Sequence, residues 1–411
     1  MKKLILFFLI PFTMVMADFT LAGQTLTPVN EDETTTPVTT SSIPTATRTY
    51  TTTGSAKTNW GFQPFTVPSD SVTVPAGGDI QAAINSMPEG GTVYLKAGIY
   101  NVQNLQFRTS NIVLQGEGVD KTILKTKSGQ KTVFTHCNNF DGCVENLILR
   151  DFKVDANGNG GITFAWGPSN LLFENIEVSH PGDSGITVNN NNWKYNGHNV
   201  TFRNIYIHNS GMHGFDVRFT KGIVIDNYRA HDLKQGIDIS SCKYAEISNI
   251  TVERALWGGM KFPSISHLYM HDVNIKDCNV LGIKLQEGTK YLPTEPQHLH
   301  LQNVTVENSG AGIVWIGTEN LKYDPPVIDM VVENVKLVNN RDNWDNITNK
   351  PIDPYGKVHT QIRMNIKIQD LYEYGDNIDI TDTHPINYHK FITGNPKDQG
   401  VGWRSWPALF N

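Results

Sequence analysis

Charged side chains recur at one repeated position of this 411-residue sequence. Each stands between apolar residues, as Asp238 does in Ile237-Asp238-Ile239, and in chain order the position reads Thr187, Asp216, Asp238, Lys261 and Lys284. Such alternation predicts short strands with one face in a core and the other face outward. Carboxylates and ammonium groups on one outward face can do acid–base chemistry or bind a charged ligand.

The signs of these charges favour a functional site over a stabilising ladder. Asp216 and Asp238 are expected on adjacent strands about 4.8 Å apart, and so are Lys261 and Lys284. Like charges on adjacent strands destabilise a sheet, whereas a ladder of surface ion pairs would alternate the signs. The next outward position adds Arg218 beside the two aspartates.

This set of groups suits the removal of the C5 proton from a uronate sugar, the first step of β-elimination. Arg218 or Lys284 can neutralise the substrate carboxylate. Lys261 is the expected base, because the neighbouring ammonium of Lys284 would lower its pKa. His213 is a candidate proton donor to the leaving oxygen, and His180 and Tyr291 are weaker candidates.

Asp216 and Asp238 also predict a Ca²⁺ site, since calcium prefers oxygen ligands and the two carboxylates stand on adjacent strands. Asp183 is either a further ligand or a turn residue. In the alternative, Arg218 takes the place of the metal ion, and Asp238 holds the catalytic lysine.

Aromatic residues near these strands predict a carbohydrate-binding groove, because aromatic faces stack on sugar rings. Trp193 and Tyr195 lie in one long insertion and Tyr291 lies in another, while Trp257 stands at the opposite edge. We expect these four residues and Asp238 to contact the substrate.

The elements that must position these residues form a repeat. A glycine opens each of the strands concerned, at Gly161, Gly185, Gly214, Gly236, Gly259, Gly282 and Gly312. Two more alternating strands precede each glycine, split by a turn whose second residue is Asn175, Asn204, Asn227, Asn249, Asp272, Asn303 or Asn334. Asparagine tolerates the left-handed backbone of a tight turn and can bond to its equivalent one coil away. Three strands per coil predict an all-β parallel β-helix.

The rest of the chain divides into a leader, a linker and two caps. Residues 1–17 predict a bacterial signal peptide, with Lys2 and Lys3 before an apolar run, so we expect a secreted or periplasmic protein. Residues 18–60 are rich in Thr, Ser and Pro and predict a linker or tail. Residues 61–345 predict the β-helix, which begins with an amphipathic capping helix, and 346–411 a C-terminal coil and cap.

Composition limits the partners. The formal net charge of −6 argues against nucleic acid and an acidic membrane as general partners. No segment after the leader is apolar for long enough to span a bilayer. We expect a monomer that binds an acidic polysaccharide through a local cationic groove. Cys137–Cys143 is the more accessible pairing if the cysteines oxidise, and buried free thiols are the alternative.

The cap, the stretch TSNIVLQGEGVDKTIL and the glycine-led coils resemble the pectate lyase superfamily of right-handed β-helix proteins, from about Val67 to Asn340. This resemblance implies a single-stranded right-handed β-helix. It does not choose among the lyases, hydrolases, epimerases and phage tailspikes that share the fold.

Two finer comparisons bear on activity. The aspartate pairs and the Gly-His-Gly histidine of β-helix polygalacturonases have no counterpart here, and only Lys284 resembles their Arg-Ile-Lys arginine. "HGFDVR" is similar to the Tyr-Gly-Phe-Asp-Pro-His motif of mannuronan C5-epimerases, with His213 for the tyrosine and Arg218 for the histidine.

From these patterns we expect a secreted polysaccharide lyase that cleaves an acidic, uronate-containing polysaccharide such as pectate or alginate. The alternatives are a C5-epimerase, a glycoside hydrolase, or a carbohydrate-binding β-helix protein without catalysis.

Overall fold

The computed structural model describes residues 60–136, 143–190, 197–286, 297–310, 312–316 and 328–338, and four short strands beyond them. The chain divides into a unit 1–49, which lies outside the described residues, and a unit 50–411, to which everything below belongs. In the described residues, no helix has the length and apolar character needed to cross a membrane.

Short parallel strands make up almost all of this unit. The first coils contain β1 (Ser71–Val74), α1 (Ile80–Asn85), β2 (Gly91–Leu95), β3 (Gly98–Val102), β4 (Ile112–Gln115), β5 (Thr122–Thr126), β6 (Lys131–His136), β7 (Glu145–Asp155), β8 (Gly160–Ala165), β9 (Ser169–Ser179) and β10 (Ile186–Asn189). The central coils contain β11 (His198–Arg218), β12 (Lys221–Ser240), β13 (Lys243–Pro263), β14 (His267–Lys276) and β15 (Leu281–Gln286). The last are β16 (Gln297–Glu307), β17 (Ile313–Ile316), β18 (Ile328–Val338), β19 (Trp344–Asp345), β20 (Lys350–Pro351), β21 (Ile368–Tyr374) and β22 (Ile380–Thr381).

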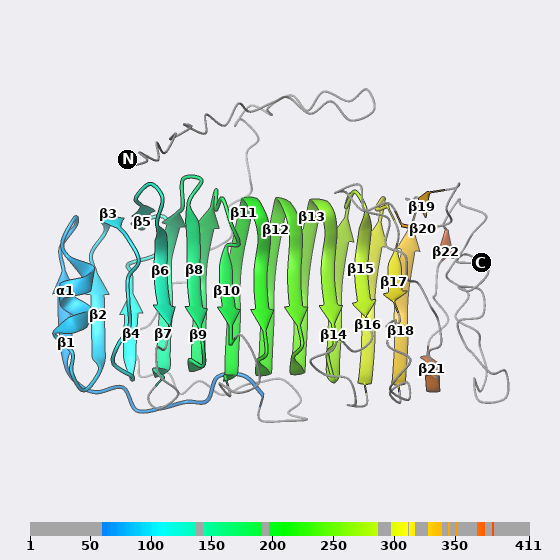
Figure 1. Cartoon of the computed structure of the whole chain (residues 1–411), viewed down its shortest axis with the longest axis horizontal. Helices are drawn as coiled ribbons and strands as arrows, with labels where there is room; N and C mark the ends of the chain where they lie inside the picture. Colours follow the sequence, from blue (N-terminus) through cyan, green and yellow to red (C-terminus); the bar gives the residue numbers. More distant parts are fainter. Residues whose placement is uncertain are drawn as a thin grey trace, which may run out of the picture. The chain divides into compact units, whose positions relative to one another are not determined.

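Successive coils stack in parallel, so that each strand pairs with its equivalent one coil later (Figure 1). β11, β12 and β13 each run through a whole coil, and β11 pairs with β12 along nearly its full length. The predicted all-β parallel β-helix is therefore confirmed, with three strand segments per coil and little helix.

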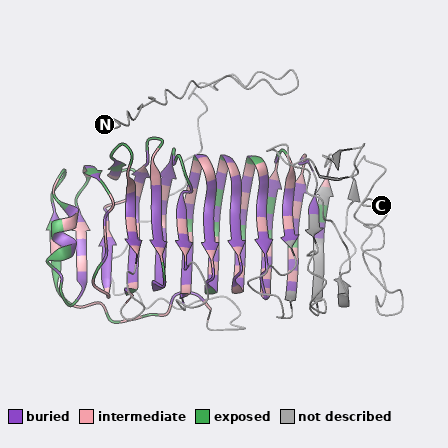
Figure 2. Ribbon diagram, in the orientation of Figure 1, coloured by how far each residue is buried: buried purple, intermediate pink, exposed green. Residues whose placement is uncertain are grey.

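The core is a column of aliphatic and aromatic side chains inside the coils. Aromatic rings contact one another in this core: Phe173 stacks on Phe202 of the next coil with centroids 5.1 Å apart, and Phe202 meets Phe215 within the same coil at 4.4 Å. Tyr228 contacts Phe215 from the next coil and donates its hydroxyl hydrogen to the carbonyl of Gly236 at 3.0 Å. The strands are mostly buried, whereas exposed residues gather on α1 and in the turns (Figure 2).

Two repeated positions keep the coils in register: the asparagine of the tight turn and the glycine that opens the third strand. Asn204 donates to Asn175 and accepts from Asn227, each at 2.8 Å, which confirms the asparagine ladder there. The ladder is interrupted at Asn249, whose amide donates to Asp226 instead. The leading glycines pack tightly: a Cβ on Gly161 would lie 2.0 Å from the carbonyl oxygen of Gly185.

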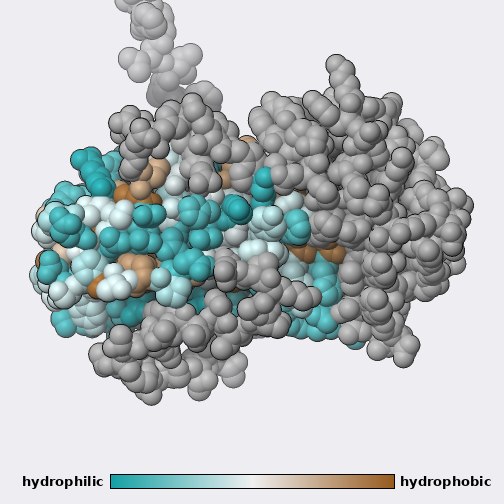
Figure 3. Space-filling view, turned by 90° about the horizontal axis from the view of Figure 1, so that it is seen from below, coloured by the Kyte–Doolittle hydropathy of each residue, from teal (hydrophilic) through white to brown (hydrophobic). Residues whose placement is uncertain are grey.

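The N-terminal end has the predicted helical cap. Asp79 caps α1 by accepting from the backbone N–H of Ala82 at 2.9 Å, and the helix buries Ile80 and Ile84 in the core. Ahead of it, Phe62 packs on an outer face of the coils against Val113, Ile148 and Leu172. On the face shown in Figure 3, the described surface is mostly hydrophilic, with small hydrophobic patches. The predicted C-terminal cap lies outside the described residues, apart from short strands.

Candidate active site

The predicted row of outward side chains exists. The glycine-led segments of β8, β10, β11, β12, β13 and β15 pair side by side, and their registers align Thr163, Thr187, Asp216, Asp238, Lys261 and Lys284. The next outward position aligns Asn189, Arg218 and Ser240. Core residues on either side, such as Ile237 and Ile239, fix the row on the outer face.

The two aspartates are far less exposed than outward residues on an amphipathic strand should be. Asp216 is 8% exposed and Asp238 is 2% exposed. A carboxylate cannot be buried without partners, because it loses its hydration. The expectation that Asp238 faces solvent is therefore corrected: it lies beneath its neighbours and is fully bonded to them.

Each aspartate is paired with its own cation, and this offsets part of the repulsion between the two carboxylates. Asp238 accepts a hydrogen bond from Lys261 Nζ through Oδ2 at 2.9 Å and one from the Ser240 hydroxyl through Oδ1. Asp216 Oδ1 accepts from Arg218 Nε at 2.6 Å. The two cations remain partly exposed, so the buried carboxylates act as anchors for accessible positive charges.

The surroundings move the pKa values of the two carboxyl groups in opposite directions. Burial raises the pKa of Asp216, and Arg218 opposes this only in part. Burial also acts to raise the pKa of Asp238, but Lys261, Ser240 and His213 outweigh it and leave that pKa below its ordinary value.

His213 stands at the edge of the same cluster. It is 9% exposed, and its Nδ1 lies 3.4 Å from the Ser184 hydroxyl and 3.9 Å from Asp216 Oδ2. Burial lowers the pKa of His213, against the opposing influence of Asp238 and Asp216. The imidazole is therefore neutral near pH 7. Within the described part of the chain no hydrogen bond engages Nε2, whose lone pair can act as a base when Nδ1 carries the proton.

Gln235 is a functional candidate that the sequence alone did not indicate. It aligns with His213 on the next strand and precedes Asp238 by three residues, as His213 precedes Asp216. The side chain is 5% exposed, and among the described residues its Nε2 has no hydrogen-bond partner. Buried donors without partners are rare in folded proteins and call for an explanation, such as a ligand.

The calcium expectation finds little support in these contacts. Both oxygens of Asp238 accept from protein donors, and Asp216 is paired with Arg218. No group of three or more His, Cys, Asp or Glu residues is arranged to hold a metal ion in the described parts of the chain. Asp183 pairs with Lys131 at 3.1 Å. The two aspartates as arranged do not fit Ca²⁺, which takes six to eight oxygen ligands.

Of the other residues predicted for the site, Lys284 and Trp257 are among those that the structure describes. Lys284 aligns with Lys261 on the next coil. Trp257 is half-buried and contacts Lys234, whose Nζ lies 5.2 Å from the ring centroid. Trp193, Tyr195 and Tyr291 lie outside the described residues.

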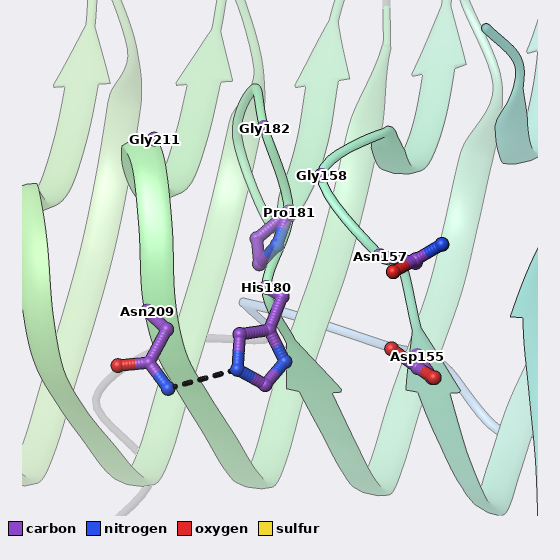
Figure 4. Close-up of a pocket in the computed structure, with 8 residues that line it drawn as sticks. All are labelled: Asp155, Asn157, Gly158, His180, Pro181, Gly182, Asn209 and Gly211. Atoms are coloured by element: carbon purple, nitrogen blue, oxygen red, sulfur yellow. Dashed lines mark hydrogen bonds between the residues drawn. The ribbon is translucent and has the colours of Figure 1, made fainter. Parts of the chain in front are cut away.

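His180, a candidate proton donor, lies elsewhere in the described structure. It bonds to Asn209 at 3.2 Å in a shallow pocket that also includes Asp155 and Pro181 (Figure 4). Of the cysteines, Cys143 is disulfide-bonded, whereas Cys242 and Cys278 are buried free thiols. Cys137 lies outside the described residues.

Comparison with known proteins agrees with this architecture. A family model described as "Right handed beta helix region" matches residues 193–324, and "Rhamnogalacturonase A/epimerase, pectate lyase-like" matches residues 76–258. The chain thus has a right-handed β-helix of the pectate lyase-like type, as the sequence resemblance implied. No curated protein matches it.

Several solved structures are similar at low identity. ORF18 of Geobacillus virus E2 is 13% identical, with a TM-score of 0.41, over 60% of this chain and 61% of that one. The enzymatically active domain of tailspike protein 2 from bacteriophage CBA120 is 13% identical, with a TM-score of 0.48, over 62% of this chain and 40% of that one. The A-module of a mannuronan C-5 epimerase from Azotobacter vinelandii is 16% identical, with a TM-score of 0.31, over 74% of this chain and 94% of that one. This chain therefore covers less than two thirds of the length of the first two proteins. These similarities concern the fold alone.

Proposed function

We propose that this protein is a carbohydrate-active β-helix enzyme that cleaves a uronate-containing polysaccharide by β-elimination. One observation carries the proposal: a neutral imidazole, His213, stands beside two accessible cations, Arg218 and Lys261, that buried carboxylates hold in place. This combination provides a base together with fixed positive charge, which the removal of a proton next to a carboxylate requires.

An acidic polymer suits the local charge of the row, although the whole chain is negative. The partly exposed Arg218 and Lys261 lie on one face, two coils apart with Asp238 on the coil between them, and Lys284 follows on the next coil. Cations fixed in advance stabilise developing negative charge at little reorganisation cost. Fixed cations favour an anionic ligand over a neutral one, so the proposed substrate carries carboxylates, as pectate and alginate do.

In the proposed step, His213 Nε2 takes the C5 proton of the uronate. Arg218 and Lys261 stabilise the negative charge that develops on the substrate carboxylate. The electron pair of the C5–H bond forms the C4=C5 double bond, and the C4–O bond breaks toward the leaving sugar. The ammonium of Lys261 supplies the proton that the leaving oxygen needs. The base role of Lys261 expected from the sequence remains the alternative.

The test is incubation of the purified protein with pectate, alginate and related polyuronates, with ultraviolet absorbance of the unsaturated product as the readout. We expect that absorbance on at least one of them, with and without EDTA. Its absence from every polyuronate would refute β-elimination. Activity that EDTA abolishes would restore the calcium proposal.

Hydrolysis is the second candidate, because the adjacent Asp216 and Asp238 have pKa values shifted in opposite directions. Such a pair is typical of a general acid and a carboxylate base or nucleophile. Against it, both oxygens of Asp238 are already bonded. New reducing ends without ultraviolet absorbance would favour hydrolysis, and altered NMR signals without chain cleavage would favour epimerisation. Binding without any of these changes would indicate a carbohydrate-binding protein.

The proposed substrate is extracellular, in agreement with the signal peptide proposed for residues 1–17. Fractionation of an expressing bacterium, followed by N-terminal sequencing of the exported chain, tests both proposals. A mature chain that begins at Asp18 is expected, and retention of the leader in the cytoplasm would refute them.

A further inference from the structure

The outer face that carries the candidate active site continues beyond the charged residues toward the N-terminal coils. There β6, β8 and β10 lie side by side ahead of β11 (Figure 1). Their registers align Phe134 with Thr163, Thr187 and Asp216, and His136 with Ala165, Asn189 and Arg218. Phe134 and His136 therefore extend the same two outward rows.

Trp166 places an aromatic surface beside these rows. Its ring stacks on that of His136, with centroids 5.3 Å apart and planes 9° from parallel. The ring of His136 in turn contacts Phe134 edge-on at 5.2 Å. The residue that pairs with His136 on β8 is the small Ala165. Trp166 nevertheless remains 36% exposed, one of few large apolar residues so exposed in the described structure.

The backbone does not explain why this residue is a tryptophan. Trp166 has a φ of 65°, and Phe219, Ser241 and Ser264 adopt similar positive values at the equivalent corner of later coils. The corner thus requires the left-handed conformation, for which Asn is far better suited than a bulky aromatic residue. At this corner Phe219, Ser241 and Ser264 are buried, whereas the indole is directed outward.

We propose that Trp166, supported by His136 and Phe134, is a distal subsite that stacks on a pyranose ring of the bound polysaccharide. The proposal rests on the proposed function for its substrate class. Trp166 directly follows β8, which lies two strand spacings from the segment of β11 that carries Asp216. This is about 10 Å and corresponds to about two sugar units. A polymer bound along the row at the reaction centre reaches the indole without leaving the outer face.

This subsite makes binding depend on chain length. Short oligosaccharides occupy only the charged centre, whereas chains that extend two or more units toward the N-terminal coils also cover the indole. Affinity therefore rises with length until the chain reaches Trp166, and then levels off. Substitution of Trp166 removes this rise.

The experiment is calorimetric titration of the full chain with pectate and alginate oligosaccharides, from dimers to octamers. Trp166→Ala is expected to lower affinity for the longest oligosaccharides by about tenfold, the effect of one aromatic contact, and to leave that for dimers unchanged. Trp166→Phe should retain most of the affinity. Ile99→Ala, at another exposed apolar residue, is the matched control and should behave as the wild type.

Equal affinities of wild type and Trp166→Ala at every length would overturn the subsite, as would a wild type that binds none of the oligosaccharides. Thermal unfolding of each variant separates a folding defect from a lost contact, and Trp166→Asn, which suits the left-handed corner, replaces Trp166→Ala if the latter unfolds. Binding and product formation are separate readouts, so length-dependent binding in the absence of any product refutes the proposed lyase activity alone. Product formation with unchanged binding by Trp166→Ala refutes the subsite alone.

Discussion

Lys261 Nζ lies 2.9 Å from Asp238 Oδ2, and the two ends of this ion pair differ sharply in exposure: 31% for the lysine side chain and 3% for the aspartate side chain. The buried carboxylate of Asp238 therefore holds the accessible ammonium group of Lys261 in place. Arg218 and Asp216 repeat the arrangement on the preceding coil. Removing either cation leaves a buried carboxylate without its partner, whereas removing both members of a pair does not.

The first prediction concerns the stability of this pair. Lys261→Met should lower the free energy of unfolding by about 2–4 kcal/mol, since it leaves Asp238 buried and unpaired. Lys261→Met combined with Asp238→Asn should recover most of that loss, and both variants should lose turnover. Urea unfolding measures the effect. Lys234→Met, which removes a lysine bonded to no carboxylate in the described structure, should stay within about 0.5 kcal/mol of the wild type.

The second prediction is the acid response of the same pair. Because the pKa of Asp238 is lower in the folded state than its ordinary value of 3.8, its ionised form stabilises the fold above that value. This contribution is lost as pH falls below 3.8 through the folded pKa. Acid unfolding should thus be steeper for the wild type than for the variant with both Lys261→Met and Asp238→Asn. Identical acid profiles would contradict the lowered pKa.

The third prediction identifies the base. If neutral His213 takes the proton, kcat/KM stays level near neutral pH and falls as pH drops through a value below 6.5, the ordinary pKa of histidine. His213→Gln should reduce turnover by about a hundredfold or more, with little change in stability. A rate that instead climbs steadily into the alkaline range would favour Lys261 as the base.

The fourth prediction uses Gln235. Gln235→Leu should leave the free energy of unfolding unchanged or raise it, because it removes a buried donor that lacks a partner. If the amide binds substrate, the same change should raise KM by several-fold to about tenfold, the effect of one hydrogen bond. Unchanged kinetics would exclude a role in recognition, and a large loss of stability would indicate a structural role.

The fifth prediction separates conformation from hydrogen bonding in the asparagine ladder. Asn204 has a φ of 53° and bonds to asparagines on both neighbouring coils. Asn204→Ala should lower the free energy of unfolding by about 2–3 kcal/mol, because it loses these bonds and strains the turn. Asn204→Gly keeps the conformation without strain and should lose less, as thermal unfolding will measure. Equal losses would show that strain contributes nothing.

The coil repeat could be predicted from the sequence because its determinants are local. The alternation around Ile237 and Ile239 fixes which side of a strand is buried. Asparagines at the tight turns, such as Asn204, and glycines at the close approaches, such as Gly161, fix where each coil turns. Once these positions recur, the registers of neighbouring coils follow, and with them the outward row.

The content of the candidate site was less predictable, because it depends on contacts across coils. The sequence placed Arg218 beside Asp216 but gave no reason to expect that the carboxylate is buried beneath it. His213 precedes a glycine at a corner, where the chain direction cannot be inferred from alternation. The unpartnered amide of Gln235 is a property of its surroundings, so it leaves no mark on composition or spacing.

By itself, then, the sequence determined the all-β coil, its capping helix, and the single face that carries Asp216, Asp238, Lys261 and Lys284. Backbone periodicity and side-chain polarity suffice for this, since both are local. Only the tertiary structure decided which charges pair, which groups are desolvated, and that Trp166 and His136 extend the same face. Burial and pKa depend on every neighbour within a few ångströms, and stacking the coils brings together neighbours that are distant in the chain.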